Sequence, residues 1–140
     1  MAKETIVFTN GCFDILHIGH VRLLERARLM GDTLIVGLNS DRSFKAAKGR
    51  SPITPQDQRA EILEAIWAVD EVILFDEPTP IELIKEIRPD ILVKGADWNS
   101  EDVVGKEYAG RVETIDTDCD IHTSKIIERI RSEIRLRKAE

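Results

Sequence analysis

Five short apolar segments rich in β-branched residues recur along this chain, and they constrain its fold more than any other feature. They lie at residues 5–9, 33–38, 71–75, 90–94 and 111–115. Most read as continuous apolar runs, which is typical of strands buried on both faces. Stretches with helical spacing lie between them, and this alternation implies a mainly parallel sheet with right-handed crossovers and helices on both faces. We therefore expect an α/β, Rossmann-like fold with a five-stranded sheet.

The helices expected between these strands have recognisable ends. One runs over residues 20–30 and stops at Gly31, since glycine commonly follows the end of a helix. Two more begin at Thr54 and Thr79, where threonine, proline and an acidic residue form a capping signature, and Pro89 ends the second. The helix that begins at Thr54 is expected to carry four apolar residues on one side: Ile62, Leu63, Ile66 and Trp67.

The last expected helix begins at Thr123. Four isoleucines at positions 126, 127, 130 and 134 form a stripe on one face, and Arg129, Arg131 and Arg135 occupy the other. We expect its tail, 136–140, to be frayed. The least regular part of the chain is the polar connection 39–52, which is expected to be a mobile flap carrying Lys45, Lys48 and Arg50.

Length and composition exclude several classes of protein. At 140 residues, with 42% apolar and 33% charged residues, the chain is expected to form one domain over 1–140 with a core of its own. A net charge of −6 argues against a nucleic-acid partner, because binding to phosphate backbones needs a basic surface. No apolar run approaches the roughly 20 residues that span a bilayer, and the start lacks the apolar core of a signal peptide. We expect a cytoplasmic location, no membrane partner, and free thiols at Cys12 and Cys119.

The stretch TNGCFDILHIGH, residues 9–20, follows the first strand and contains two histidines three residues apart. If a helix starts near Ile18, the rings of His17 and His20 can project toward the same point. The free backbone N–H groups and the dipole of a helix start favour a phosphate there. Gly19 and Gly11 let a bulky anion approach the backbone closely. This arrangement suits phosphoryl or nucleotidyl transfer, in which the protein mainly positions groups and stabilises charge.

Three other interpretations stay open for this stretch. A single histidine near a helix start is more often a helix cap or a packed side chain than a catalyst, whereas two with a glycine between them favour the catalytic interpretation. Cys12, His17 and His20 are a candidate zinc site, although no Cys-x-x-Cys partner accompanies them. A module that binds nucleotide without turnover would keep the phosphate site but would not need both histidines.

The same stretch resembles the signature of the small nucleotidyltransferases of the cytidylyltransferase family, whose motif is H-x-G-H. Further motifs similar to those of the family follow in its order. These are NSD at 39–41, KGRSPITPQDQR at 48–59, VKGADW at 93–98 and HTSKII at 122–127.

The resemblance implies roles for particular residues. His17 and His20 would contact the triphosphate of ATP or CTP and stabilise the transition state at its α-phosphate. Lys48, with Lys45 as a second candidate, would reach phosphates from the flap. Thr123 and Ser124 would bind phosphate at the start of the last helix. The remaining expected nucleotide-binding residues are Thr9, Asn10, Gly11, Cys12, Phe13, Asp14, Gly19, Asn39, Asp41, Arg59 (at the triphosphate), Lys94, Gly95, Asp97 and Trp98.

The resemblance also implies magnesium, held mostly by substrate oxygens and water, and a homodimer. Asp14 and Asp97 are conceivable magnesium contributors, but each is equally well explained as a turn or cap residue. The sequence contains no dedicated metal cage.

Two branches of the family compete for the acceptor, which is a sugar or polyol phosphate. The motifs as a whole resemble the branch that makes ADP-heptose from ATP and heptose 1-phosphate, a lipopolysaccharide precursor. The glycerol 3-phosphate branch, which uses CTP, is similar at 23–28 and 69–73. It normally has an arginine before the last helix, and residues 116–124 contain none. The ADP-heptose branch has its own mismatches, at Ala96 and at His122, which stands where that branch has serine. Other acceptors, such as flavin mononucleotide, also remain open.

Overall fold

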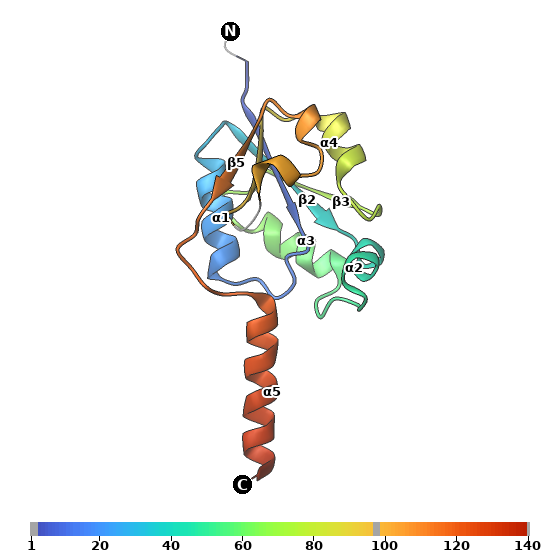
Figure 1. Cartoon of the computed structure of the whole chain (residues 1–140), viewed down its shortest axis with the longest axis vertical. Helices are drawn as coiled ribbons and strands as arrows, with labels where there is room; N and C mark the ends of the chain where they lie inside the picture. The colour runs from blue at the N-terminus through green and yellow to red at the C-terminus, as the bar shows by residue number, and fades with distance from the viewer. Residues whose placement is uncertain (1–2, 97–98, 140) are drawn as a thin grey trace.

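Five parallel strands form the centre of the molecule, in the order β3-β2-β1-β4-β5 (Figure 1). The computed structural model describes residues 3–96 and 99–139. The strands are β1 (Ile6–Gly11), β2 (Thr33–Asn39), β3 (Glu71–Phe75), β4 (Ile91–Gly95) and β5 (Arg111–Ile115). The expected Rossmann-like sheet is therefore confirmed, and the expected strand bounds are correct to within two residues.

The apolar pattern of each strand follows its position in the sheet. Val7 of the central strand β1 lies beside Leu34 of β2 and Ile91 of β4, and all three are fully buried. On the edge strands β3 and β5, by contrast, exposed and buried positions are mixed. Continuous apolar runs thus mark the strands that helices cover on both faces.

Two core layers lie on opposite faces of the sheet. One holds Leu24 of α1 (Ile18–Arg28) and Leu63 of α3 (Gln56–Glu64). The other holds Ile84 of α4 (Ile81–Ile87) against Phe8 and Leu92. Two short 3₁₀ turns, η1 (Ser100–Asp102) and η2 (Lys106–Tyr108), follow β4. The two layers hold the ends of β1 and β4 in fixed positions.

The expected flap at 39–52 is wrong, because most of it is a helix, α2 (Asp41–Lys48). Ser40 caps its first turn by accepting a hydrogen bond from the Ser43 N–H, and Gly49 ends it in the left-handed conformation at φ 74°. The buried Phe44 anchors α2 to the body of the domain. The polar composition of the segment reflects a mostly exposed helix rather than a loop.

The capping signatures are displaced by one residue. α3 and α4 begin after Pro55 and Pro80, and neither cap residue makes a side-chain hydrogen bond, so Thr54 and Thr79 are not caps. α3 also ends at Glu64, which leaves Ile66 and Trp67 beyond it. Of the four apolar residues expected on one side, Leu63 is buried whereas Ile62 and Trp67 are exposed.

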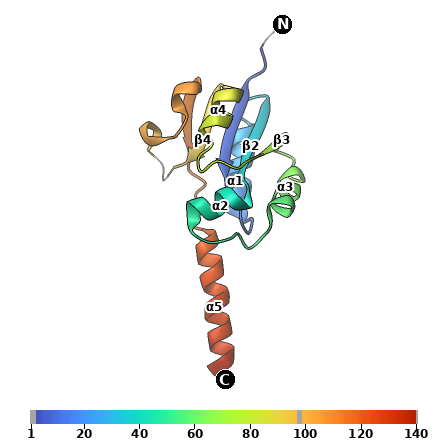
Figure 2. The same ribbon diagram turned by 90° about the vertical axis from the view of Figure 1, so that its right-hand side faces the viewer.

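The last helix, α5 (Thr123–Ala139), stands away from the rest of the molecule (Figures 1 and 2). It begins where the sequence predicts and is helical through residues 136–139, and the fraying of this tail stays a prediction. None of its residues is buried. Within the described part of the chain, no helix is long and apolar enough to cross a membrane.

Candidate active site

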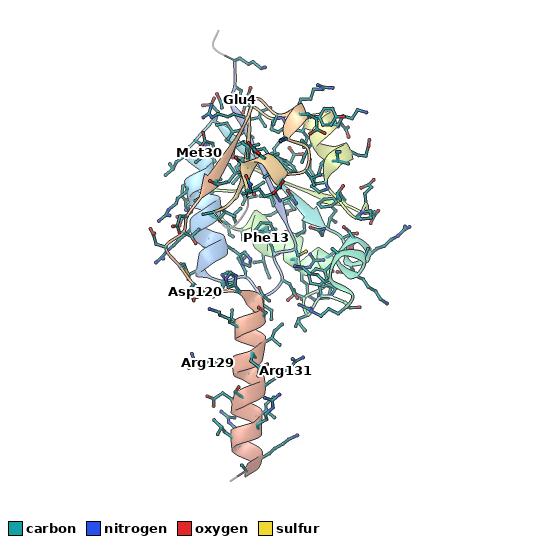
Figure 3. The ribbon with its side chains drawn as sticks, in the orientation of Figure 1. Glu4, Phe13, Met30, Asp120, Arg129 and Arg131 are labelled. Atoms are coloured by element: carbon teal, nitrogen blue, oxygen red, sulfur yellow. The ribbon has the colours of Figure 1, made fainter. Side chains whose placement is uncertain are left out.

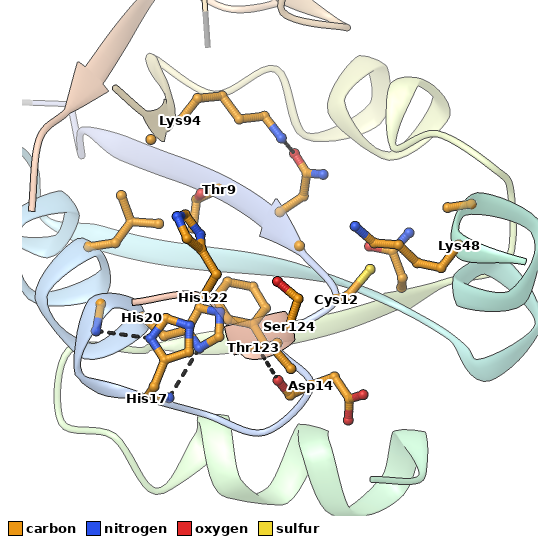
Figure 4. Close-up of a pocket in the computed structure, with 18 of the residues that line it drawn as sticks. Thr9, Cys12, Asp14, His17, His20, Lys48, Lys94, His122, Thr123 and Ser124 are labelled. Carbon is orange, nitrogen blue, oxygen red and sulfur yellow. Dashed lines mark hydrogen bonds between the residues drawn. The ribbon is translucent and has the colours of Figure 1, made fainter. Parts of the chain in front are cut away.

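A cavity of about 940 Å³ opens at the carboxyl ends of the strands, between the starts of α1 and α5. Its walls come from the ends of β1, β2, β4 and β5, from α2, and from the first turn of α5 (Figure 4). The strand order reverses direction at β1, whose neighbours are β2 on one side and β4 on the other. In open parallel sheets such a reversal point is where ligands bind.

His17 and His20 stand at the entrance to α1 and are held by the helix itself. His17 is the N-cap residue, and its Nδ1 accepts a hydrogen bond from the Gly19 N–H at 3.1 Å. The Nδ1 of His20 accepts one from the His17 N–H at 3.2 Å. The two rings stack, with centroids 3.8 Å apart. α1 therefore begins with a capping box made of two imidazoles.

These hydrogen bonds determine which ring nitrogen carries the proton. Because both Nδ1 atoms accept from the backbone, each neutral ring must carry its hydrogen on Nε2. Burial and the neighbouring His17 lower the pKa of His20 to about 4, and burial and His122 lower the pKa of His17. Both rings are neutral near pH 7, and both offer an Nε2–H donor at the start of α1.

Gly19 is required by this arrangement. A Cβ at position 19 would lie 2.9 Å from Cε1 of His17 and 3.0 Å from its Nδ1. Real Cβ contacts are essentially never this short, so a side chain here would displace the imidazole. At Gly11 a Cβ would lie 3.0 Å from the ring of Phe13. Both glycines thus make room for aromatic rings of the cavity wall.

The loop between β1 and α1 is tied to two distant parts of the chain. Phe13 and Ile15 both adopt the left-handed conformation, at φ 47° and 51°. The buried carboxylate of Asp14 accepts hydrogen bonds from the Ile53 and Thr54 N–H groups, both at 2.9 Å. The carbonyl of Asp14 accepts one from the Thr123 hydroxyl at 2.7 Å. Asp14 therefore joins the strand end to the segment before α3 and to the first turn of α5.

Arg59 does not lie where the resemblance placed it. It is 1% exposed and is absent from the cavity wall. Its guanidinium donates to the carbonyls of Thr54, Cys12 and Asn39, and to the carboxylate of Asp41 at 2.8 Å. With its hydrogen bonds directed at these groups, Arg59 holds the ends of β1 and β2 together rather than contacting a triphosphate.

Two lysines and one cysteine line the wall of the cavity that lies opposite the two histidines. Lys94, at the end of β4, donates to the side-chain carbonyl of Asn10 at 2.7 Å, and burial lowers its pKa to about 8. Lys48 reaches the cavity from the last turn of α2. Burial raises the pKa of the Cys12 thiol, which is therefore a poor nucleophile near pH 7. The cavity combines neutral donors on one side with ammonium groups on the other.

The structure brings most of the sequence-predicted residues to this one cavity, and a few elsewhere. Asp41, Lys45 and Arg59 are not part of its wall, and Asp97 and Trp98 lie outside the described residues. The remaining fifteen line it: Thr9, Asn10, Gly11, Cys12, Phe13, Asp14, His17, Gly19, His20, Asn39, Lys48, Lys94, Gly95, Thr123 and Ser124.

Half of the residues that line the cavity were not among the predicted site residues. Phe44 and Arg50 line the cavity, with the Arg50 guanidinium 5.2 Å from the centre of the Phe44 ring. Residues 78–80 also line it. Their position just after β3 is the signal that would have found them, since the carboxyl ends of all parallel strands meet at the same edge.

The described residues do not form a magnesium or zinc cage. Among residues 3–96 and 99–139, no group of three or more histidine, cysteine, aspartate or glutamate side chains is placed to hold a metal ion. Both carboxylate oxygens of Asp14 already accept backbone hydrogen bonds, and one lies 3.7 Å from Arg50. Asp14 therefore does not fit the role of a magnesium ligand, and the zinc alternative gains no support.

Comparison with known proteins identifies the family to which this site belongs. A family model described as cytidylyltransferase-like matches residues 8–129. The chain belongs to the cytidylyltransferase-like family. This confirms the resemblance carried by the H-x-G-H motif. In this family member the motif is the capping box of α1.

Relatives of this cytidylyltransferase-like chain include much longer proteins. It is 54% identical over 132 residues to the bifunctional protein HldE of Syntrophotalea carbinolica, covering 91% of this chain and 27% of that protein. It is 55% identical over 130 residues to the bifunctional protein HldE of Nitratiruptor sp., covering 92% of this chain and 28% of that protein. The chain thus spans little more than a quarter of the length of these curated relatives.

A solved structure supports the fold. The lipopolysaccharide core biosynthesis protein from Thermoplasma volcanium is 32% identical, with a TM-score of 0.63. The match covers 69% of this chain and 79% of that one. The cytidylyltransferase-like sheet is therefore shared with a relative of comparable extent.

Proposed function

We propose that this chain transfers AMP from ATP to a sugar 1-phosphate, heptose 1-phosphate, giving ADP-heptose and pyrophosphate. The observation that carries the proposal is the pair of neutral imidazoles at the start of α1, with Nε2–H donors in a cavity that two helix starts border. Membership of the family supports nucleotidyl transfer. The sequence motifs and the high identity to HldE proteins support this acceptor.

In the proposed reaction, an oxygen of the sugar phosphate attacks the α-phosphorus of ATP. A new phosphorus–oxygen bond forms, the bond from the α-phosphorus to the bridging oxygen breaks, and pyrophosphate leaves with the electron pair. The nucleophile is already an anion at neutral pH, so the step needs no general base. What it needs is stabilisation of the charge that gathers on the α-phosphate oxygens.

The chain's own groups supply this stabilisation. Donors that are preorganised in a site without bulk water cost no reorganisation when the charge develops. The Nε2–H groups of His17 and His20 are such donors. Lys48 and Lys94 balance the charge of the phosphates from the opposite wall. Ser124 presents a hydroxyl from the first turn of α5.

Three further expectations belong to the proposal. Magnesium would be carried by the oxygens of the triphosphate and by water, because the described residues form no cage for it. A homodimer and a cytoplasmic location are expected as well.

The test is pyrophosphate release across a grid of ATP and CTP against heptose 1-phosphate and glycerol 3-phosphate, with magnesium present. Turnover with ATP and heptose 1-phosphate is expected. Turnover only with CTP and glycerol 3-phosphate would replace the proposed acceptor with that of the other branch. Flavin mononucleotide with ATP is the third acceptor to include.

Variants of the histidines separate catalysis from simple binding. His17→Ala and His20→Ala are each expected to lower kcat by roughly 10²–10³, the usual effect of removing one preorganised donor. ATP binding, followed by calorimetry, serves as the control for an intact cavity. Unchanged turnover in both variants would remove the catalytic assignment. ATP binding without pyrophosphate release from any acceptor would favour a nucleotide sensor.

A further inference from the structure

Segment 116–122, which joins β5 to α5, forms one side of the cavity and has no role in the reaction described above. Five of its residues line the wall: Asp116, Thr117, Cys119, Ile121 and His122. Two arginines of α1 hold this segment. Arg26 donates to the carbonyl of residue 116, and Arg22 donates to the carbonyl of residue 117 at 3.4 Å. The segment, which we call the strap, is therefore fastened to α1 before it reaches α5.

His122, the last residue of the strap, is held by contacts on both sides of it. The carbonyl of Ile121 lies 3.7 Å from the position that a Cβ on Gly19 would take, so the strap packs on the start of α1 there. The hydroxyl of Thr123 donates to the carbonyl of Asp14 at 2.7 Å. The carbonyl of His122 accepts hydrogen bonds from two N–H groups in the first turn of α5, at 3.0 and 3.3 Å. These contacts fix the backbone of His122, so its ring is presented from a defined position.

His122 and His17 stand at the same position of two helices, but their rings point in different directions. Each is the residue directly before its helix, and both helix starts border the cavity. The ring of His17 turns back and caps α1. For the ring of His122, no hydrogen bond is found within residues 3–96 and 99–139, and Figure 4 shows the ring beside the histidine pair and turned into the cavity. The His122 ring is therefore available to a ligand.

The neighbours of the His122 ring include one carboxylate and one imidazole. The side chain of His122 is 60% exposed, and its Nε2 lies 3.7 Å from a carboxylate oxygen of Asp120, which is too long for a hydrogen bond. Asp120, where the strap meets α5 (Figure 3), is instead engaged by the ammonium of Lys125 at 2.7 Å. The imidazole is that of His17, whose pKa is lowered by burial and by His122. A ring with these neighbours can donate an N–H to an anionic ligand.

The strand order indicates which part of the substrates meets His122. β4 and β5 lie on one side of β1, and β2 and β3 lie on the other. The strap follows β5, and segment 93–95, which resembles the family's nucleotide loop, belongs to β4. ATP is therefore expected on this side, with its α-phosphate at His17 and His20.

The geometry of the reaction then separates the leaving group from the acceptor. In an in-line displacement the attacking and leaving oxygens lie on opposite sides of the phosphorus. With ATP on the side of β4 and β5, pyrophosphate leaves toward the strap, and the acceptor approaches from the side of β2 and β3. His122 is therefore placed to meet the phosphates of the leaving group.

We propose that His122 binds the β- and γ-phosphates of ATP and holds them as they leave as pyrophosphate. The inference rests on the proposed function and extends it to a residue that the resemblance leaves unexplained, since the ADP-heptose branch has serine at this position. An imidazole reaches further into the cavity than a serine hydroxyl, and it can be protonated, which serine cannot. His17 and His20 then act on the α-phosphate, while His122 secures the leaving group.

The first experiment compares the steady-state kinetics of the wild-type chain and His122→Ala, with magnesium, ATP and heptose 1-phosphate. KM for ATP is expected to rise by about 10-fold or more, the usual effect of losing a hydrogen bond to a charged group. kcat is expected to change by less than about 3-fold, because His122 holds the phosphates equally well before and during the reaction. If KM for ATP stays within about 2-fold of the wild-type value, the proposal is overturned, whether or not KM for heptose 1-phosphate or kcat changes.

Two further variants separate phosphate binding from a structural role at the start of α5. Lys125→Ala is the matched control, because Lys125 lies in the same helical turn and is charged but is not among the described residues of the cavity wall. Its KM for ATP is expected to stay within about 2-fold of wild type, since an exposed ion pair contributes little. His122→Gln keeps a side-chain N–H donor and is expected to recover most of the affinity for ATP. A lower melting temperature of His122→Ala with equal weakening of every ligand would assign His122 to the helix structure and overturn the proposal.

Calorimetry tests the same contact without turnover, with ATP, pyrophosphate and AMP as probes. His122→Ala is expected to weaken the binding of ATP and pyrophosphate by about 10-fold and to leave AMP unchanged, because AMP has no β- or γ-phosphate. Equal weakening of AMP would place His122 at another part of the nucleotide and overturn the proposal.

The proposed reaction and the role of His122 can fail separately. If His122→Ala loses affinity for ATP and pyrophosphate but the wild-type chain releases pyrophosphate with no acceptor, the proposed reaction is removed and the role of His122 stands. If the wild-type chain makes ADP-heptose and His122→Ala binds ATP normally, the proposed reaction stands and the role of His122 is removed.

Discussion

At position 19, the addition of one methyl group would change the position of the His17 imidazole. Gly19→Ala is expected to move this ring out of its capping position, because the added Cβ would lie 2.9 Å from Cε1. We expect kcat to fall by about 10², comparable to loss of one preorganised donor. A double-mutant cycle with His17→Ala is the check. If Gly19 acts through His17, adding Gly19→Ala to His17→Ala changes kcat little; a second full loss would show another cause.

The low pKa of His20 predicts how stability depends on pH. Its pKa is about 4 in the folded chain and 6.5 in the unfolded one, so the unfolded chain binds the proton first as the pH falls. The folded state therefore loses stability between pH 6.5 and about 4. His20→Asn keeps an acceptor for the His17 N–H but does not titrate, so its melting temperature should fall less over this range. An equal fall in both proteins would contradict the shift.

Lys94 predicts a second pH effect, this time on activity. Its pKa of about 8 means that the free protein loses this positive charge above that pH. If Lys94 attracts a phosphate, kcat/KM is expected to decline as the pH rises past about 8, since this parameter reports groups of the free enzyme. Lys94→Arg, which stays charged, should abolish the decline. A decline that persists in Lys94→Arg would assign it to another group.

Among the elements, the ends of β1 and β2 depend on one buried guanidinium. Arg59→Met is expected to lower the free energy of unfolding by about 3–5 kcal/mol, because it leaves a buried network without its donor. Arg42→Met, on the exposed side of α2, is the control and should change stability by less than about 0.5 kcal/mol. Urea unfolding measures both.

Arg59→Lys separates the structural role of this residue from a role in phosphate binding. A lysine keeps the charge but cannot reproduce the planar fork that reaches four partners. If Arg59 is structural, the lysine variant is nearly as unstable as Arg59→Met. Wild-type stability combined with weakened ATP binding would restore the original expectation for this residue.

The success of sequence reasoning also varies by element. Continuous apolar runs predicted the strands, since burial on both faces leaves no room for polar residues. α2 was missed because a short helix that buries only Ser43 and Phe44 has the composition of a loop. The Thr-Pro pairs at residues 54 and 79 satisfy the capping pattern and so predict threonine caps, yet proline itself stands at the cap position in both helices.

For the whole molecule, the parallel sheet follows from packing rules, but the direction of a side chain does not. That the first strand end carries the cavity was predictable from the parallel sheet and the histidine motif. The inward turn of Arg59 was not, because burial of a charge depends on acceptors from three separate segments. The sequence could not predict that α5 stands away from the rest of its chain. An amphipathic stripe has the same pattern whether the surface that packs on it belongs to the same chain or to another.

The imidazole capping box has a consequence for anyone who wants a more heat-resistant version of this protein. Aspartate is a better N-cap than histidine, so routine cap optimisation would choose His17→Asp. We expect that substitution to keep or raise the melting temperature while kcat falls by at least about 10², because the Nε2–H donor disappears. A variant that gained stability and kept full turnover would contradict this. Selection for stability alone would therefore remove activity at this position, and a thermostability screen of this chain should leave residues 17–20 unchanged.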